Sequence, residues 1–276
     1  MSDPASGVFD VTGFRSAAPY INQHRDHNFV IAFGGEAVAD AAFANLINDI
    51  ALLHSLGVKL VLVHGARPQI EHLLKREGQR SKYHDGLRVT DDRALDAVKR
   101  AVGSLRVEIE ARLSMGLYNT PMAGMRINAA SGNFITARPL GVHNGVDFLH
   151  TGEVRKVDTH AIRQLLAHGS VVMLSPLGYS PTGETFNLSA EDVAATTASA
   201  MQADKLVFLA ETDPLRDSKK RLLRQLSLGD AQALLTGKRK LSPAQRRHLE
   251  YAVNACLSNV RRVHLLDRRV DGALLK

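Results

Sequence analysis

The chain has 276 residues, of which 45% are apolar, enough for one large α/β domain or two small ones with a buried core. Its formal net charge is +7, but aromatic residues make up only 5% and no stacking side chains interleave with the basic clusters, such as those at 219–221 and 238–240. Nucleic acid is therefore not expected as a partner. A solvated face, or a face that meets an acidic partner domain, accounts better for the clusters.

Several other classes of protein are excluded by simple patterns. No apolar run approaches the ~18 residues of a membrane span, and residues 1–12 contain no basic residue of the kind that opens a secretion signal. The single cysteine, Cys256, cannot form an intrachain disulfide. The histidines show no metal-binding spacing on one helix, so no metal is expected. These features predict a cytoplasmic protein without membrane contact.

An amphipathic segment precedes the first strand. It presents Val11, Phe14, Ala18, Tyr20 and Ile21 at roughly helical spacing. Two interpretations stay open: an edge helix that packs on its own domain, or a helix that packs on a neighbouring subunit.

Strands and helices are then predicted to alternate. The first four segments are a strand at 29–33, a helix at 41–56, a strand at 59–63 and a helix at 68–77. The later ones are a helix at 91–115, short strands with Gly turns over 123–155, a helix at 160–168, a strand at 171–175, a turn at 181–184, a helix at 188–201, a strand at 205–210, a capped helix from Ser242 to 257 and a strand at 262–266. This order predicts a parallel sheet with right-handed crossovers, in one domain.

Glycines follow the first two strands. Gly34, Gly35 and Gly65 would let backbone N–H groups approach an oxyanion or phosphate at the carboxyl edge of the sheet, where open α/β sheets bind ligands. Taken alone, such turns are more often simple tight connections.

Four motifs in order make the pattern specific. Residues 29–35, 61–66, 86–90 and 186–192 resemble the motif series of the acetylglutamate kinases, in order and spacing, over roughly residues 28–270. The resemblance implies a three-layer αβα fold with an open, mostly parallel sheet, the amino-acid-kinase-like fold. In those kinases the N-terminal half holds the acyl-amino acid and the C-terminal half holds ATP. Arg88 then matches a residue that binds a substrate carboxylate, and Asn187 belongs to the substrate motif.

The chain departs from the kinases at the charged positions. Ala32 stands where they carry a lysine before the Gly pair, Ala252 lies in the stretch that matches a second lysine, and Glu191 replaces an aspartate that positions both. Phosphoryl transfer depends on positioned positive charge, and losing one such charge costs on the order of 10²–10³ in rate. We therefore expect a vestigial kinase site with no catalytic residue. The alternative is an active acetylglutamate-type carboxylate kinase that uses ATP, with Arg246 or Arg247 as a substitute cation.

Further segments match a narrower group. Residues 14–22, 52–57, 65–70, 111–115 and 130–135 resemble the bacterial, arginine-sensitive N-acetylglutamate synthases. In that family a kinase-like domain binds L-arginine and builds the oligomer, and a following acetyltransferase domain moves acetyl from acetyl-CoA to L-glutamate, the first step of arginine synthesis. The resemblance implies an oligomerising segment at 1–27 and a regulatory domain at 28–276. We expect the acetyltransferase domain and its acetyl-CoA to be missing from this chain, which then needs no cofactor.

Arginine binding has its own matching positions. By the same resemblance these are Tyr20, Lys205, His264, Asp271 and Gly272. Arginine needs acceptors for its guanidinium and a cation or N–H groups for its carboxylate. Each position also has a simpler explanation: Tyr20 as a packing residue, Lys205 as a solvated strand-end charge and His264 as a core histidine.

Overall fold

A computed structural model describes residues 11–115, 124–211, 214–217, 219–237 and 240–275. The basic residues 238 and 239, and residues 212 and 213 after the strand at 205–210, lie outside the described residues. So does the side chain of Phe14.

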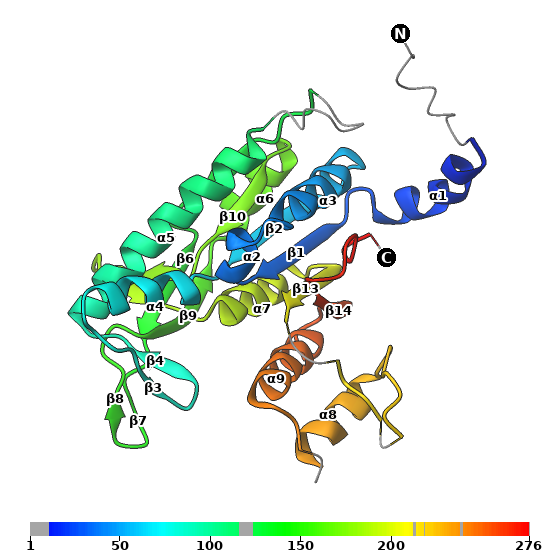
Figure 1. The fold of residues 1–276 in the computed structure, drawn as a ribbon. Coiled ribbons are helices and arrows are strands. Elements are labelled where there is room, and N and C mark those ends of the chain that lie inside the picture. Colours follow the sequence, from blue (N-terminus) through cyan, green and yellow to red (C-terminus); the bar gives the residue numbers. More distant parts are fainter. Residues whose placement is uncertain (1–10, 116–123, 212–213, 218, 238–239, 276) are drawn as a thin grey trace.

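A six-stranded sheet forms the centre of the molecule (Figure 1). Every neighbouring pair in it is parallel, in the order β14-β13-β1-β2-β10-β5. The strands are β1 (Asn28–Phe33), β2 (Lys59–His64), β5 (Ala129–Ser131), β10 (Val171–Leu174), β13 (Lys205–Ala210) and β14 (Arg262–Asp267). The parallel sheet expected from the β-α-β-α pattern is confirmed.

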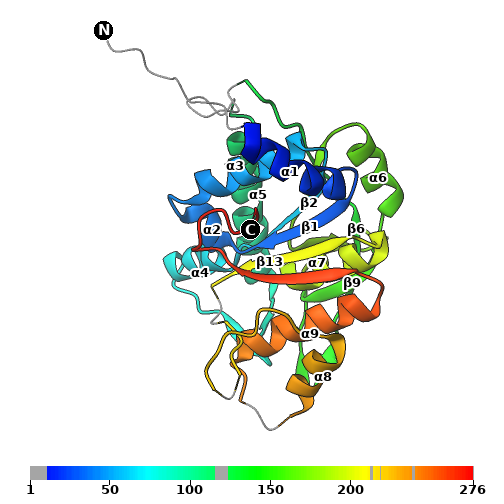
Figure 2. The same ribbon diagram turned by 90° about the vertical axis from the view of Figure 1, so that its right-hand side faces the viewer.

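Both faces of this sheet are buried, because alternate residues of each strand enter different cores. Phe29 and Ile31 of β1 join one cluster, and Val30 and Ala32 join the other. The first cluster includes side chains of α3 (Phe43–Ser55), α4 (Arg67–Arg76) and α5 (Asp92–Leu113), and the second includes those of α6 (Thr159–Ala167), α7 (Ala190–Met201) and α9 (Pro243–Leu257). Seen from the β14 edge, α3 and α4 lie on one side of the sheet and α6 on the other (Figure 2). The predicted three-layer αβα architecture is confirmed.

Smaller elements surround the main sheet. A second sheet has the order β12-β11-β6-β9, and two hairpins, β3-β4 and β7-β8, stand beside it. These strands are β3 (Lys82–His84), β4 (Leu87–Val89), β6 (Ile135–Pro139), β7 (Val142–His143), β8 (Val146–Asp147), β9 (Gly152–Val157), β11 (Leu177–Tyr179) and β12 (Thr185–Asn187). Short strands were expected over 123–155, and the structure confirms them within its described part.

The helix expected over 41–56 is confirmed as α3, but two other helices were not predicted. The short α2 (Gly35–Ala39) precedes α3, and between them Asp40 is extended and its side chain accepts the N–H of Ala42. The helix α8 (Leu228–Thr236) was not predicted, although Ser227 and Asp230 form a capping box at its start. With α9 it encloses a small separate apolar cluster.

The N-terminal helix α1 (Val11–His24) projects from the body of the molecule (Figure 1). Two large side chains on it are exposed, Val11 at 45% and Tyr20 at 68%. Its last residue, His24, touches the domain through the ring of Phe29, with ring centroids 5.6 Å apart. No helix within the described ranges has the length and apolar character needed to cross a bilayer.

A histidine is buried where β2 ends. His64 is fully buried, and its Nδ1 lies 3.2 Å from the carbonyl oxygen of Gly65, while Nε2 has no hydrogen-bond partner among the described residues. Burial lowers the pKa of His64 to about 4, and the nearby charge of Arg106 acts in the same direction. The folded protein therefore keeps this ring neutral under conditions in which an unfolded chain would protonate it.

This burial predicts a pH-dependent loss of stability. Below about pH 6.5 the unfolded chain binds a proton at His64 that the folded chain does not bind until about pH 4, so the free energy of unfolding falls across that window. Between pH 7 and pH 4.5, wild-type protein should lose on the order of 2–3 kcal/mol more than the variant His64→Leu, since one pKa unit corresponds to about 1.4 kcal/mol. Urea denaturation at both pH values measures the difference. Equal losses of unfolding free energy in the two proteins would show that His64 is not the source of this pH dependence.

Candidate functional site

A cleft of about 330 Å³ opens at the carboxyl ends of β1, β2 and β13. Its walls include the loops after these strands, the β3-β4 hairpin, the start of α7 and one turn of α9. The predicted positions that line it are Ala32, Gly34, Gly35, Gly65, Arg88, Asn187 and Glu191. The structure thus brings together seven of the eight residues expected in the vestigial kinase site.

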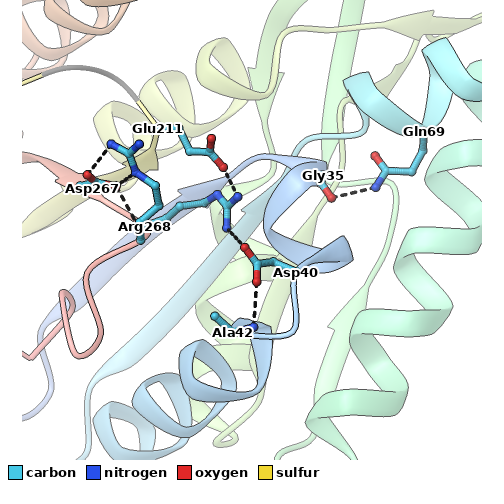
Figure 3. Close-up of polar contacts among 8 residues, drawn as sticks. Gly35, Asp40, Ala42, Gln69, Glu211, Asp267 and Arg268 are labelled. Carbon is cyan, nitrogen blue, oxygen red and sulfur yellow. Dashed lines mark hydrogen bonds and ion pairs between the residues drawn. The ribbon is translucent and has the colours of Figure 1, made fainter.

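The glycine loops pack directly against each other. A Cβ on Gly65 would lie 3.3 Å from the Cα of Gly34 and 3.5 Å from the backbone N of Gly35. The Gly35 carbonyl accepts a 2.7 Å hydrogen bond from Nε2 of Gln69 (Figure 3). The absence of side chains is therefore needed for the approach of the two loops, as well as for any approach of a ligand.

The floor of the cleft carries no cation at the first strand. Ala32 is 5% exposed and pairs with Val63 and Phe208 of the neighbouring strands. It also belongs to one of the two apolar cores. A methyl group at this position cannot stabilise a phosphate charge.

Arg88 points its charge toward the protein's own groups. Its Nη2 lies 2.7 Å from Oε1 of Glu71, and its Nη1 donates to Ser81. The guanidinium carbon lies 4.9 Å from the ring centroid of Tyr83, whose hydroxyl also donates to Glu71, at 2.5 Å. Burial acts to raise the pKa of Glu71, but the bonds from Tyr83, Ser81 and Arg88 outweigh it and lower this pKa. Glu71 was not predicted as the partner of Arg88, because no local pattern links the two residues.

Asn187 is part of a buried hydroxyl network. Its Nδ2 donates to Oγ1 of Thr90 at 3.0 Å, and Thr90 and Thr151 share a 2.8 Å hydrogen bond. The Thr151 hydroxyl in turn donates to the carbonyl of Arg88. The network joins the hairpin, the small sheet and the start of α7, which gives Asn187 a structural task at the cleft wall.

Glu191 lies opposite the glycine loops with basic residues of α9. Its Oε2 accepts a 2.7 Å hydrogen bond from Ser189. Burial acts to raise its pKa, but this bond, its own backbone N–H and the charge of Arg247 outweigh burial, so the pKa of Glu191 is lowered. Arg247 and His248 line the cleft, whereas Ala252, about one turn further along α9, does not. Burial lowers the pKa of His248, which leaves Arg247 as the cation that α9 brings to the cleft.

A second group of predicted residues gathers away from the cleft, on the face of the sheet that carries α1. Lys205 is the first residue of β13. The other end of this strand, at the cleft, lies five residues later, or about 16 Å away along the strand. Its Nζ lies 3.4 Å from Nε2 of His24 and 4.9 Å from the ring centroid of Phe29. Tyr20 precedes His24 by four residues on α1 and so lies on the same side of that helix.

His264 completes this cluster from the next strand. It pairs with Val207, two residues after Lys205, so their side chains point to the same face. Its Nε2 is buried and has no hydrogen-bond partner among the described residues. Burial first, and then the positive neighbours Lys205 and Arg262, lower the pKa of His264, while burial and Arg262 lower that of Lys205. A neutral imidazole and a partly desolvated ammonium make a site that favours an anionic group.

Asp271 and Gly272 lie on the segment after β14. Oδ1 of Asp271 accepts a 2.9 Å hydrogen bond from Asn45 of α3, and Gly272 has a φ of +66°, which favours glycine. Leu274, two residues on, packs against the core on the α3 side of the sheet. The segment therefore folds back over the same face that carries Lys205 and His264. No group of three or more metal-ligating side chains comes together in the described part of the chain.

Several known proteins are similar to this chain in sequence. The chain is 49% identical over 266 residues to an amino-acid acetyltransferase of Ralstonia nicotianae, covering 96% of this chain and 58% of that protein. A second amino-acid acetyltransferase, from Ectopseudomonas mendocina, is 50% identical over 265 residues, with 96% and 61% covered. The chain thus spans about 60% of the length of the curated relatives that it matches.

Solved structures share the fold. N-acetylglutamate synthase from Neisseria gonorrhoeae, in complex with coenzyme A and L-arginine, matches with a TM-score of 0.86 at 38% identity, covering 96% of this chain and 62% of that one. A carbamate kinase from Giardia lamblia matches with a TM-score of 0.68 at 14% identity, covering 90% and 94%, and so shares the fold alone. The family model of the amino acid kinase family matches residues 28–267. The chain therefore belongs to the amino acid kinase family.

Proposed function

We propose that this chain is the kinase-like, arginine-binding part of an N-acetylglutamate synthase and performs no phosphoryl transfer itself. The observation that carries the proposal is that Lys205 and His264 point to the same face of the sheet, near the amino end of β13. They lie away from the cleft at the carboxyl ends, where Ala32 offers no cation. The relatives named amino-acid acetyltransferase, and the gonococcal synthase complexed with L-arginine, support it.

The chemistry of the second cluster suits an α-amino acid with a cationic side chain. Lys205 supplies a partly desolvated cation for the ligand carboxylate, and the neutral ring of His264 supplies a donor or an acceptor beside it. The segment with Asp271 offers a carboxylate and turn carbonyls for a guanidinium. Tyr20 would cover the ligand from α1.

Thermal unfolding with L-arginine tests this site, with L-ornithine as the ligand that lacks a guanidinium. A ligand that binds only the folded state stabilises it by about 2.7 kcal/mol at 100 times Kd, so arginine should raise the midpoint and ornithine should not. Lys205→Met should remove the rise. Lys59→Met is the matched control, since Lys59 likewise opens a parallel strand of the same sheet but sits on β2. Equal shifts with both ligands, or an unchanged shift in Lys205→Met, would count against the site.

Phosphoryl transfer is expected to be absent. The cleft presents Ala32 to the place where charge would develop, and Arg88 is already paired with Glu71. The chain incubated with ATP, Mg²⁺ and N-acetylglutamate in the presence of hydroxylamine should therefore form no acyl hydroxamate. An active acetylglutamate kinase under the same conditions is the control. Hydroxamate formed in proportion to this chain, and lost in Arg247→Gln, would establish the alternative, a carboxylate kinase with a substitute cation.

Acetyl transfer belongs, in this proposal, to the remainder of a longer protein. The relatives extend beyond the matched part by about two fifths of their length. We assign the binding of acetyl-CoA and L-glutamate to that remainder, and we assign regulation to residues 28–276. The cytoplasmic location and the lack of a cofactor and of a nucleic-acid partner stay predictions.

Self-association is assigned to residues 1–27 through α1. This helix leaves Val11 and Tyr20 exposed and projects from the domain, which favours the second of the two interpretations of this segment. Deleting residues 1–25 should lower the mass measured by sedimentation velocity, because exposed apolar side chains of this kind are buried by a partner. The variant Tyr83→Ser, which changes an exposed aromatic residue elsewhere, should keep the wild-type mass. An unchanged mass after the deletion would show that α1 does not hold subunits together.

A further inference from the structure

An arginine just after β14 joins three separate parts of the fold. Nη1 of Arg268 donates to Oδ2 of Asp40 at 2.8 Å, and its Nη2 donates to Oε1 of Glu211. Asp40 lies between α2 and α3, and Glu211 directly follows β13 and lines the cleft. The guanidinium lies between the two carboxylates (Figure 3).

The cation of this ion-pair cluster is largely removed from solvent, whereas its two carboxylates are partly exposed. The side chain of Arg268 is 11% exposed, and those of Asp40 and Glu211 are 39% and 41% exposed. The guanidinium is therefore screened less than one on the open surface. Asp40 is fixed by a second bond, since its other oxygen accepts the N–H of Ala42 at 2.9 Å. The Ala42 N–H and Arg268 together lower the pKa of Asp40, which keeps its carboxylate ionised at neutral pH.

The ion-pair cluster lies at the start of a segment, residues 268–275, that has little regular structure. The backbone of Arg268 still bonds to the carbonyl of Ala210, but after it the chain makes only turns, with Ala273 N–H bonded to the Val270 carbonyl. Further along, Asp271 is bonded to Asn45 at an exposed position. An ion pair of a nearly buried guanidinium constrains more than an exposed hydrogen bond from an amide to a single carboxylate. Arg268 therefore holds the start of residues 268–275, while Leu274 packs their end against the core.

We propose that Arg268 is a positioning residue for arginine binding: it holds the start of the segment 268–275 against α2 and the end of β13, and so sets where Asp271 and Gly272 stand. This inference rests on the proposed arginine site. Arg268 also ties that segment to Glu211 at the cleft, so the two regions share one cation. Its role is distinct from that of the ligand residues, because Nη1 and Nη2 are taken up by Asp40 and Glu211.

The chain offers a matched control at the next residue. Arg269 carries the same charge, but its guanidinium bonds to Asp267, two residues earlier on the same segment, and its side chain is 55% exposed. Arg268→Gln should raise the Kd for L-arginine at least tenfold in isothermal titration calorimetry, because Asp40 and Glu211 are left facing each other without a cation. Arg268→Lys keeps a charge but reaches one carboxylate at a time, so its Kd should lie between those of the wild type and Arg268→Gln. Arg269→Gln should stay within twofold of wild type.

A second measurement separates positioning from general destabilisation. Hydrogen exchange without arginine should speed up at the amides of residues 270–275 in Arg268→Gln and stay at wild-type rates in Arg269→Gln. An unchanged Kd in Arg268→Gln, or an equal rise in both glutamine variants, would overturn the inference. If wild-type chain binds no arginine, the proposed function fails, and exchange alone decides on Arg268: unchanged rates at residues 270–275 then overturn its positioning role as well.

Discussion

Burial of the central sheet on both faces is the constraint on which the rest of this structure depends. Because odd and even residues of each strand enter two different apolar cores, a strand interior has little room for charge. Polar side chains are therefore displaced to the strand ends, where water can reach them. The carboxyl ends carry the cleft and the amino end of β13 carries Lys205, so one sheet separates two sites by its own length.

The cleft keeps the shape of a ligand site while its charges serve the protein itself. Arg88 is held by Glu71, and Arg67 and Arg247 both donate to the carbonyl of Gly86 at the turn of the β3-β4 hairpin. The ion pair with Glu71 neutralises the charge of Arg88, whereas the carbonyl of Gly86 only fixes the direction of Arg67 and Arg247. In this way the cleft keeps its packing while the charged side chain of Arg88 is bound within the protein.

Much of the fold could be predicted from sequence, because strands buried on both faces leave long apolar runs and parallel crossovers permit few arrangements. The strands at 29–33, 59–63 and 205–210 are of this kind. The helices α2 and α8 were missed, since both are too short to show a clear apolar period. In the candidate site, the glycines were found from their place after the strands, and Ala32 from the resemblance to the kinases, which carry a lysine there. The partners Glu71 and Arg268 were not, because only the folded chain brings Arg88 to α4 and residue 268 to residue 40.

The place of β1 in the sheet has a consequence for synthesis on the ribosome. Its two neighbours are β2, which follows closely, and β13, whose register begins at Phe29 opposite Lys205. The backbone of Asn28 bonds to a side chain 176 residues later. One edge of a strongly apolar strand thus stays unpaired for most of translation, and such an edge readily recruits other chains. We expect nascent chains of this protein to need protection until residue 210 has emerged.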